Sequence, residues 1–233
     1  MSLLGAAALA MWWDVDRDPR AEFEHWHSHE HFPERMGIPG FCRATRWRSA
    51  SDGSGVFVMY ELENYEVLSS PAYLARLNAP SPWSTKMMPH HRNMVRTQCR
   101  VLHTLGGAVA RHALTVRLSP VSGAAAEPLR RELGSLMAQF SGRAGLTGAH
   151  LLKHEPPAIA TTTEQRIRGH DQEADWVLVV HGYDVAALEA VATTELEPLS
   201  LADIGAAPGA VSSLYTLSHC ATPADFQNQG DPR

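Results

Sequence analysis

The chain repeats one order of strand-like and helix-like segments on either side of a stretch of small residues at positions 106–110. In the first half, apolar runs typical of strands lie at residues 7–15, 41–50, 56–63 and 95–105, and helical patterns lie at 19–36 and 65–78. In the second half, strands are expected at 112–118, 146–155, 175–183 and 211–218, and helices at 127–144 and 185–194. Both halves therefore read β-α-β-β-α-β, which is the ferredoxin-like arrangement.

This repetition predicts two ferredoxin-like units in tandem, at residues 1–106 and 111–222, followed by a flexible tail at 223–233. A single unit would leave one apolar face of its sheet bare, and such a face must be covered. We therefore predict an α+β fold in which the two units pack sheet to sheet as a barrel within one chain. Twofold dimers are common among proteins, so a homodimer of the whole chain stays open.

Composition excludes several classes of partner. The chain has 25 acidic and 20 basic residues, and its net charge of −5 argues against a nucleic-acid partner. The apolar run at residues 3–13 is too short to span a bilayer, so no membrane partner is expected. Three cysteines without a CxxC pair favour a reducing compartment. We expect a cytoplasmic protein whose partner is a small molecule.

Tryptophan and histidine are concentrated in the first half. Five of the six tryptophans and seven of the thirteen histidines lie within residues 1–110. The acidic excess, by contrast, belongs to residues 111–233. The first unit is therefore the better candidate for a functional site.

The richest segment is residues 22–35, which carries four histidines at every second position. On a helix that turns about 100° per residue, His27 and His31 share a face with Trp26 and Glu30. A histidine beside a carboxylate suits acid–base chemistry near neutral pH, so His27 and His31 are candidate catalytic groups that Glu30 would orient. Two alternatives stay open. The same side chains could bind a metal ion, or they could simply be packed or solvated.

Other residues are candidate substrate ligands. Trp26 and Trp83 would bind an apolar or aromatic substrate, and Arg46 would hold developing negative charge. Arg92 and Asn93 end a long proline-rich insertion of a kind that often lines pockets. The alternatives are that Trp83 only covers its own core and that Arg46 lies on an exposed strand face.

Trp26, followed by Glu-His-Phe-Pro-Glu at 30–34 and Ile-Pro-Gly-Phe at 38–41, resembles the dimeric α/β-barrel superfamily. The style is closest to its EthD-like and stress-responsive branches, although the step from Trp26 to His31 is one residue longer than in EthD-like proteins. The resemblance implies a pocket between sheet and helices. Members range from cofactor-free monooxygenases and isomerases to haem enzymes and ligand-binding domains.

No phosphate-binding loop, dinucleotide fingerprint or nucleophile elbow occurs in the sequence. We therefore expect a small-molecule enzyme that needs no cofactor and no metal. Its acid–base chemistry would be isomerase-, monooxygenase- or lyase-like, on a small apolar or aromatic substrate. One alternative is a non-catalytic binding or stress-responsive barrel. The other is a haem or metal enzyme.

Overall fold

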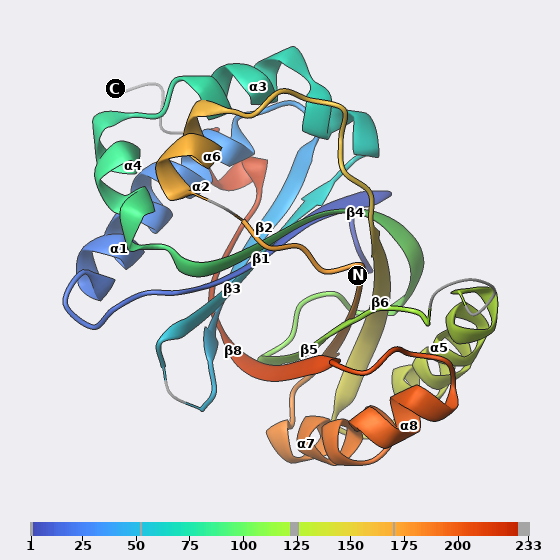
Figure 1. Ribbon diagram of the computed structural model, residues 1–233. Helices are drawn as coiled ribbons and strands as arrows, with labels where there is room; N and C mark the ends of the chain where they lie inside the picture. The colour runs from blue at the N-terminus through green and yellow to red at the C-terminus, as the bar shows by residue number, and fades with distance from the viewer. Residues whose placement is uncertain (1, 52, 122–125, 170, 228–233) are drawn as a thin grey trace.

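The computed structural model describes residues 2–51, 53–121, 126–169 and 171–227. The strands of this part of the chain form one closed antiparallel barrel in the order β1-β3-β2-β8-β5-β7-β6-β4 (Figure 1). They are β1 (Ala7–Asp14), β2 (Phe41–Ser49), β3 (Gly55–Leu62), β4 (Arg92–Gly106), β5 (His112–Leu118), β6 (Leu146–His154), β7 (Trp176–Gly182) and β8 (Val211–Ala221). The predicted α+β class and barrel are confirmed.

Helices cover the barrel in two groups. The first group is α1 (Arg20–Trp26), a π-helix η1 (His27–His31), α2 (Phe32–Met36), the 3₁₀ helix η2 (Tyr65–Ser69), α3 (Pro71–Asn78), α4 (Pro82–Met87) and the 3₁₀ helix η3 (Met88–His90). The second is α5 (Ala126–Ser141), α7 (Val185–Thr193) and α8 (Pro198–Asp203). Although α6 (Thr163–Arg168) comes from the second half, it lies with the first group (Figure 1).

Strand alternation divides the core into three apolar clusters, because successive side chains point to opposite faces of a strand. On β1, Trp12 points into the barrel and packs on Phe57, while Trp13 points outward and packs on Phe23 of α1. One cluster fills the barrel, and the other two lie between the barrel and each helix group. Any site between sheet and helices is therefore separate from the barrel interior.

The two halves are joined by hydrogen-bonded strand edges. The strands of residues 7–106 lie in the order β4-β1-β3-β2, and those of residues 112–221 lie as β8-β5-β7-β6. Antiparallel pairs β2–β8 and β4–β6 close the ring. Closure of this kind leaves no edge open for pairing with another chain. The strands of the two halves thus form one continuous sheet.

Short helices account for the differences from the sequence prediction. The helix predicted at 65–78 is broken at Ser70, which caps a new helix beginning with Pro71. The predicted loop before β4 contains α4, and the polar loop between β6 and β7 contains α6. In the predicted tail, Pro223–Asp225 forms a 3₁₀ helix (η4), and residues 228–233 lie outside the described residues. No helix in the described ranges has the length and apolar character needed to cross a membrane.

Candidate functional site

The histidine-rich segment forms a helix whose middle turn is wider than an α-helical turn. The Phe32 N–H bonds to the His27 carbonyl, five residues earlier. Pro33 follows and has no N–H to donate, so the regular hydrogen-bond ladder is interrupted at this place. Single π-turns of this type occur frequently at functional sites. Here the wide turn leaves both His27 and His31 on the buried side, at 1% and 8% exposure.

A small cavity lies between this helix and strands β1, β3 and β4. The volume of this cavity is about 30 Å³, which is room for roughly two water molecules. Its lining combines imidazoles, two phenols, guanidinium groups and apolar side chains. The lining residues are Leu9, Met11, Trp13, His27, His31, Arg35, Tyr60, Tyr73, Met88, His91, Met94, Arg96, Glu164 and Arg168.

Three imidazoles reach this cavity with unused ring nitrogens. The ring centroids of His27 and His31 are 5.2 Å apart, and the His91 ring lies 4.8 Å from that of Trp13. Within the described part of the chain, Nδ1 of His27, Nδ1 of His31 and both nitrogens of His91 lack a hydrogen-bond partner, as does the Tyr60 hydroxyl. Each unpaired buried polar group costs about 1–3 kcal/mol. Such a concentration is typical of a site that a ligand completes.

These imidazoles are uncharged near neutral pH. Burial lowers the pKa of His27 well below its usual value of 6.5, and the Arg46 charge acts in the same direction. Burial and then Arg35 do the same to the pKa of His31, and burial lowers the pKa of His91 to about 3. A neutral imidazole has a lone pair on one ring nitrogen that can accept a proton, and its lowered pKa makes it a weaker base than free imidazole. Burial also raises the pKa of Tyr60, so its hydroxyl keeps the proton that it can donate.

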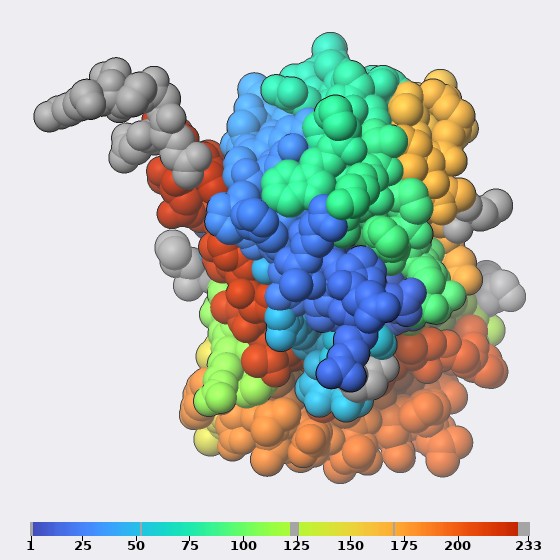
Figure 2. Space-filling view, turned by 90° about the vertical axis from the view of Figure 1, so that its left-hand side faces the viewer, coloured from blue at the N-terminus to red at the C-terminus, as the bar shows by residue number. Residues whose placement is uncertain are grey.

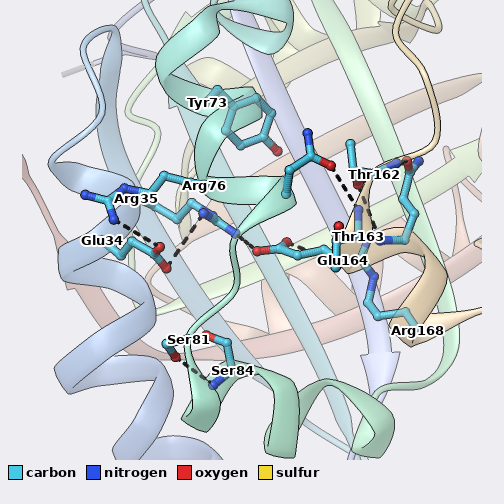
Figure 3. A network of polar contacts seen from close by, with 12 residues as sticks. Glu34, Arg35, Tyr73, Arg76, Ser81, Ser84, Thr162, Thr163, Glu164 and Arg168 are labelled. Atoms are coloured by element: carbon cyan, nitrogen blue, oxygen red, sulfur yellow. Dashed lines mark hydrogen bonds and ion pairs between the residues drawn. The ribbon is translucent and has the colours of Figure 1, made fainter.

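A buried network of charges closes the cavity from the side of α6 (Figure 3). Arg35 pairs with Glu164, which also lies 3.4 Å from Arg168; Arg168 in turn lies 3.1 Å from Asp171. Burial works against the Arg35 charge, but Glu164, Tyr73 and Glu34 together outweigh it and raise the Arg35 pKa. The first-half cavity is therefore roofed by the second half of the chain. Figure 2 shows α6 in gold beside the green segment that includes α3.

Glu30 and Trp26 lie next to the cavity without lining it. The Trp26 indole N–H donates to Glu30 at 3.0 Å and to Ser84 Oγ at 3.2 Å, and Ser81 also donates to Glu30. The Trp26 ring is fully buried, with its centroid 4.7 Å from that of His31. Trp26 and Glu30 thus connect the histidine helix to the start of α4, and the Trp26 ring packs against the His31 imidazole.

Arg46 and Trp83 form hydrogen bonds outside the cavity. Arg46 is buried on β2 and donates to Ser218 Oγ at 3.1 Å and to the Glu24 carbonyl at 3.3 Å. Burial lowers its pKa to about 10. Trp83 donates to Glu22 at 3.2 Å on the outer side of α1. Neither side chain lines the cavity.

Arg92 and Asn93 lie at the start of β4, away from the histidines. Arg92 forms an exposed ion pair with Asp16 at 2.6 Å. Asn93 has a φ of 54° and donates to Asp14 at 2.8 Å. Of the eight predicted site residues, the structure brings His27, His31 and Trp26 together, with Glu30 behind them, and places the other four elsewhere.

Sequence reasoning missed most of the cavity lining. Arg35 and Tyr60 carry no local motif, and Glu164 and Arg168 come from the other half of the chain. One signal was available: Thr162 and Gln165 form a capping box, whose S/T-x-x-E/Q spacing marks a helix start. That spacing predicts α6, although not where α6 docks.

The described residues around this cavity do not fit a metal ion or a haem group. Across the described ranges, no group of three or more His, Cys, Asp or Glu side chains is arranged to hold a metal ion. A haem macrocycle does not fit a cavity with room for about two waters.

No family model matches this chain, and no curated protein matches it. Solved structures do. An anthrone oxidase-like protein has a TM-score of 0.66 at 13% identity, covering 97% of this chain and 96% of its own. The "putative monooxygenase" of Fusobacterium nucleatum has a TM-score of 0.61 at 9% identity, with coverages of 94% and 96%. The "putative monooxygenase" of Lactobacillus acidophilus has a TM-score of 0.59 at 8% identity, covering 94% of this chain and 97% of its own. At these identities the chain shares their fold.

Proposed function

We propose that this chain is a small-molecule enzyme that abstracts a proton from a small apolar or aromatic substrate in the cavity beneath the histidine helix, without a cofactor. One observation carries the proposal. Among the described residues, His27, His31 and His91 each have at least one buried ring nitrogen without a hydrogen-bond partner, and all three line a single cavity with lowered pKa values. Buried groups with strongly shifted pKa values in a cavity are typical of acid–base sites.

The cavity residues divide the work by their chemistry. His27 or His31 accepts the substrate proton, and the Tyr60 hydroxyl donates a hydrogen bond to the oxyanion that develops. The Arg35 and Arg168 guanidinium groups, which share Glu164 as an ion-pair partner, also line the cavity. This division supports reactions through an enolate or phenolate, which include isomerase-, monooxygenase- and lyase-like chemistry.

The substrate class follows from the walls of the cavity. Leu9, Met11, Met88 and Met94 make them apolar, and methionine adapts readily to different shapes. A ring-sized substrate exceeds the present space, so we propose that α6 moves outward to admit it. Lids of this kind commonly gate enzyme sites.

The remaining predictions on sites and organisation stay proposals. Trp26 and Glu30 would position the histidine helix, and the Arg46 charge would act on the pKa of His27. Substrate contacts by Trp83, Arg92 and Asn93 stay predictions. We also propose two ferredoxin-like units in tandem, which the matching strand orders of the halves support, and an EthD-like style for residues 20–47. A homodimer and a cytoplasmic location likewise stay predictions.

A non-catalytic binding protein is the competing function. It is favoured by one observation, the small volume of the cavity under its ion-paired roof. A binding protein would hold a ligand without exchanging its protons.

The test is proton exchange on compounds with acidic C–H bonds. Anthrone and cyclic 1,3-diketones are incubated with the protein in D₂O, deuterium uptake is followed by NMR, and oxygen uptake is followed by electrode. We expect exchange above the protein-free rate for at least one compound, and a loss of about 10²–10⁴-fold in His27→Asn or His31→Asn. His29→Asn, on the exposed face of the same helix, is the matched control. Binding without exchange would favour the competing function.

A further inference from the structure

A second, larger cavity opens at the end of the barrel where β1, β2 and β5 end and β3, β4 and β8 begin. Its volume is about 620 Å³, within the usual range for small-molecule sites. It shares a single lining residue, Trp13, with the cavity beneath the histidine helix. It is therefore a separate place in the fold, and the proposed function does not use it.

Arg117 is the residue before the last one of β5, and it lines this cavity. Its Cζ atom lies 5.3 Å from the centroid of the Trp12 ring. That ring is itself held firmly, because it stacks on Phe57 at 5.0 Å and its indole N–H donates to Thr115 Oγ1 at 3.2 Å. The guanidinium therefore rests on a fixed aromatic surface.

Among the described residues, no carboxylate forms an ion pair with Arg117. Within the described ranges it forms no ion pair and no hydrogen bond through its side chain, and burial lowers its pKa. Two carboxylates line the same cavity, but neither pairs with it. Asp14 accepts a hydrogen bond from Asn93 at 2.8 Å, and Glu189 is exposed on α7.

An unpaired guanidinium inside a cavity is a ready site for a carboxylate, which it can hold through two parallel N–H donors. The part of the lining that belongs to the barrel cluster, which includes Trp12, Val95 and Tyr215, suits a flat ring. The hydroxyls of Ser49, Ser212 and Ser213 add polar groups to the cavity.

We propose that the open end of the barrel is a binding site for a small aromatic carboxylate. Arg117 holds the carboxylate, and the apolar lining beside Trp12 takes the ring. This site is independent of the proton-transfer site, so either can exist without the other.

The probe is 2-naphthoate, titrated into the full chain by calorimetry and followed in ¹H–¹⁵N spectra. We expect saturable binding that shifts the Trp12 indole N–H signal. Because hydrogen bonds to charged groups are stronger than those between neutral groups, Arg117→Gln should bind at least about tenfold more weakly. Arg111→Gln, which changes an exposed arginine just before β5, is the matched control and should bind like the wild type. The neutral amide of the probe should bind the wild type at least about tenfold more weakly.

Three results would overturn the proposal. They are no saturable binding up to about 10 mM, equal affinity in Arg117→Gln, and loss of binding in His27→Asn, which would place the probe in the other cavity. Melting temperatures check that each variant is folded. If Arg117→Gln does not fold, the wild-type comparison of acid with amide, read at the Trp12 signal, decides the question.

Discussion

Arg35 of α2 and Glu164 of α6 form an ion pair with both side chains buried, although 129 residues separate them in the chain. The pair fixes the long β6–β7 loop over a cavity whose imidazoles all come from the first half. Arg168 and Asp171 extend the network along the same loop. The cavity is therefore a product of both halves of the barrel.

Removing one partner of this pair should destabilise the protein strongly. In Glu164→Ala, Arg35 keeps its charge in a buried place without its main partner, which typically costs about 3–5 kcal/mol. Urea unfolding at neutral pH measures the change in the free energy of unfolding. Glu127→Ala, which removes an exposed carboxylate 3.6 Å from Arg130, is the control and should leave stability nearly unchanged. Equal effects of the two substitutions would contradict a structural role for the network.

Stability should fall as the pH is lowered from neutral. Burial of the imidazole lowers the pKa below the usual 6.5 in five histidines, which are His27, His31, His91, His150 and His181. Below pH 6.5 the unfolded chain binds protons that the folded chain does not, so each group favours unfolding by up to about 1.4 kcal/mol per pH unit. Urea unfolding at a series of pH values from about 5 to 8 measures the slope. A stability independent of pH over this range would contradict neutral buried imidazoles.

One substitution should lower the number of protons bound on unfolding by about one, which weakens the pH dependence of stability. His181 lies in the barrel core with neither ring nitrogen paired within the described ranges, so His181→Leu removes one of the shifted groups. We expect the pH dependence of the unfolding free energy to weaken by about one proton between pH 5 and 6.5. An unchanged slope would show that His181 takes up its proton in the folded state.

The β4–β6 seam should not tolerate a side chain at Gly148. A Cβ atom there would lie 2.5 Å from the Gly107 carbonyl oxygen and 2.6 Å from that of Leu105, both of which are backbone atoms. We expect Gly148→Ala to lower the free energy of unfolding by about 1–3 kcal/mol. Gly134→Ala is the matched control. Its Cβ meets nothing within 4 Å in the middle of α5, so it should stabilise by about 0.5–1 kcal/mol. Similar effects at both positions would contradict the close approach at the seam.

The cap of α4 should contribute measurably. Ser81 accepts a hydrogen bond from the Ser84 N–H at 2.9 Å, and its hydroxyl donates to Glu30 of the histidine helix. Ser81→Ala should cost about 0.5–2 kcal/mol in thermal or urea unfolding. Ser135→Ala, at an exposed position on α5, should have little effect. No difference between the two would mean that α4 does not depend on its cap.

Much of the fold could be predicted from the sequence, because apolar alternation and helical spacing are local properties. The order of long strands and helices follows from them, as do the β2–β3 and β6–β7 hairpins. Helices of six residues, such as α4, α6 and α8, could not be found by periodicity, since they are too short to show a repeat. Their capping residues and N-terminal prolines are the sequence features that indicate where these short helices begin.

The site was predictable only in part for the same reason. Helical spacing placed His27 and His31 on one face, and the structure buries both. Spacing could not show that Glu30 on that face turns to Trp26 and α4, nor that His91 reaches the same cavity. The roof residue Glu164 depends on the docking of a distant loop, which only the three-dimensional structure records.

The most direct test of the central claim compares two variants of one helix. His27→Asn removes an imidazole from the cavity, and His25→Asn removes an exposed one two residues earlier. Both are assayed for deuterium exchange on the compound that the wild type exchanges fastest. The account predicts a rate at least about 100-fold lower in His27→Asn than in His25→Asn. Equal rates in two folded variants would contradict proton transfer by His27.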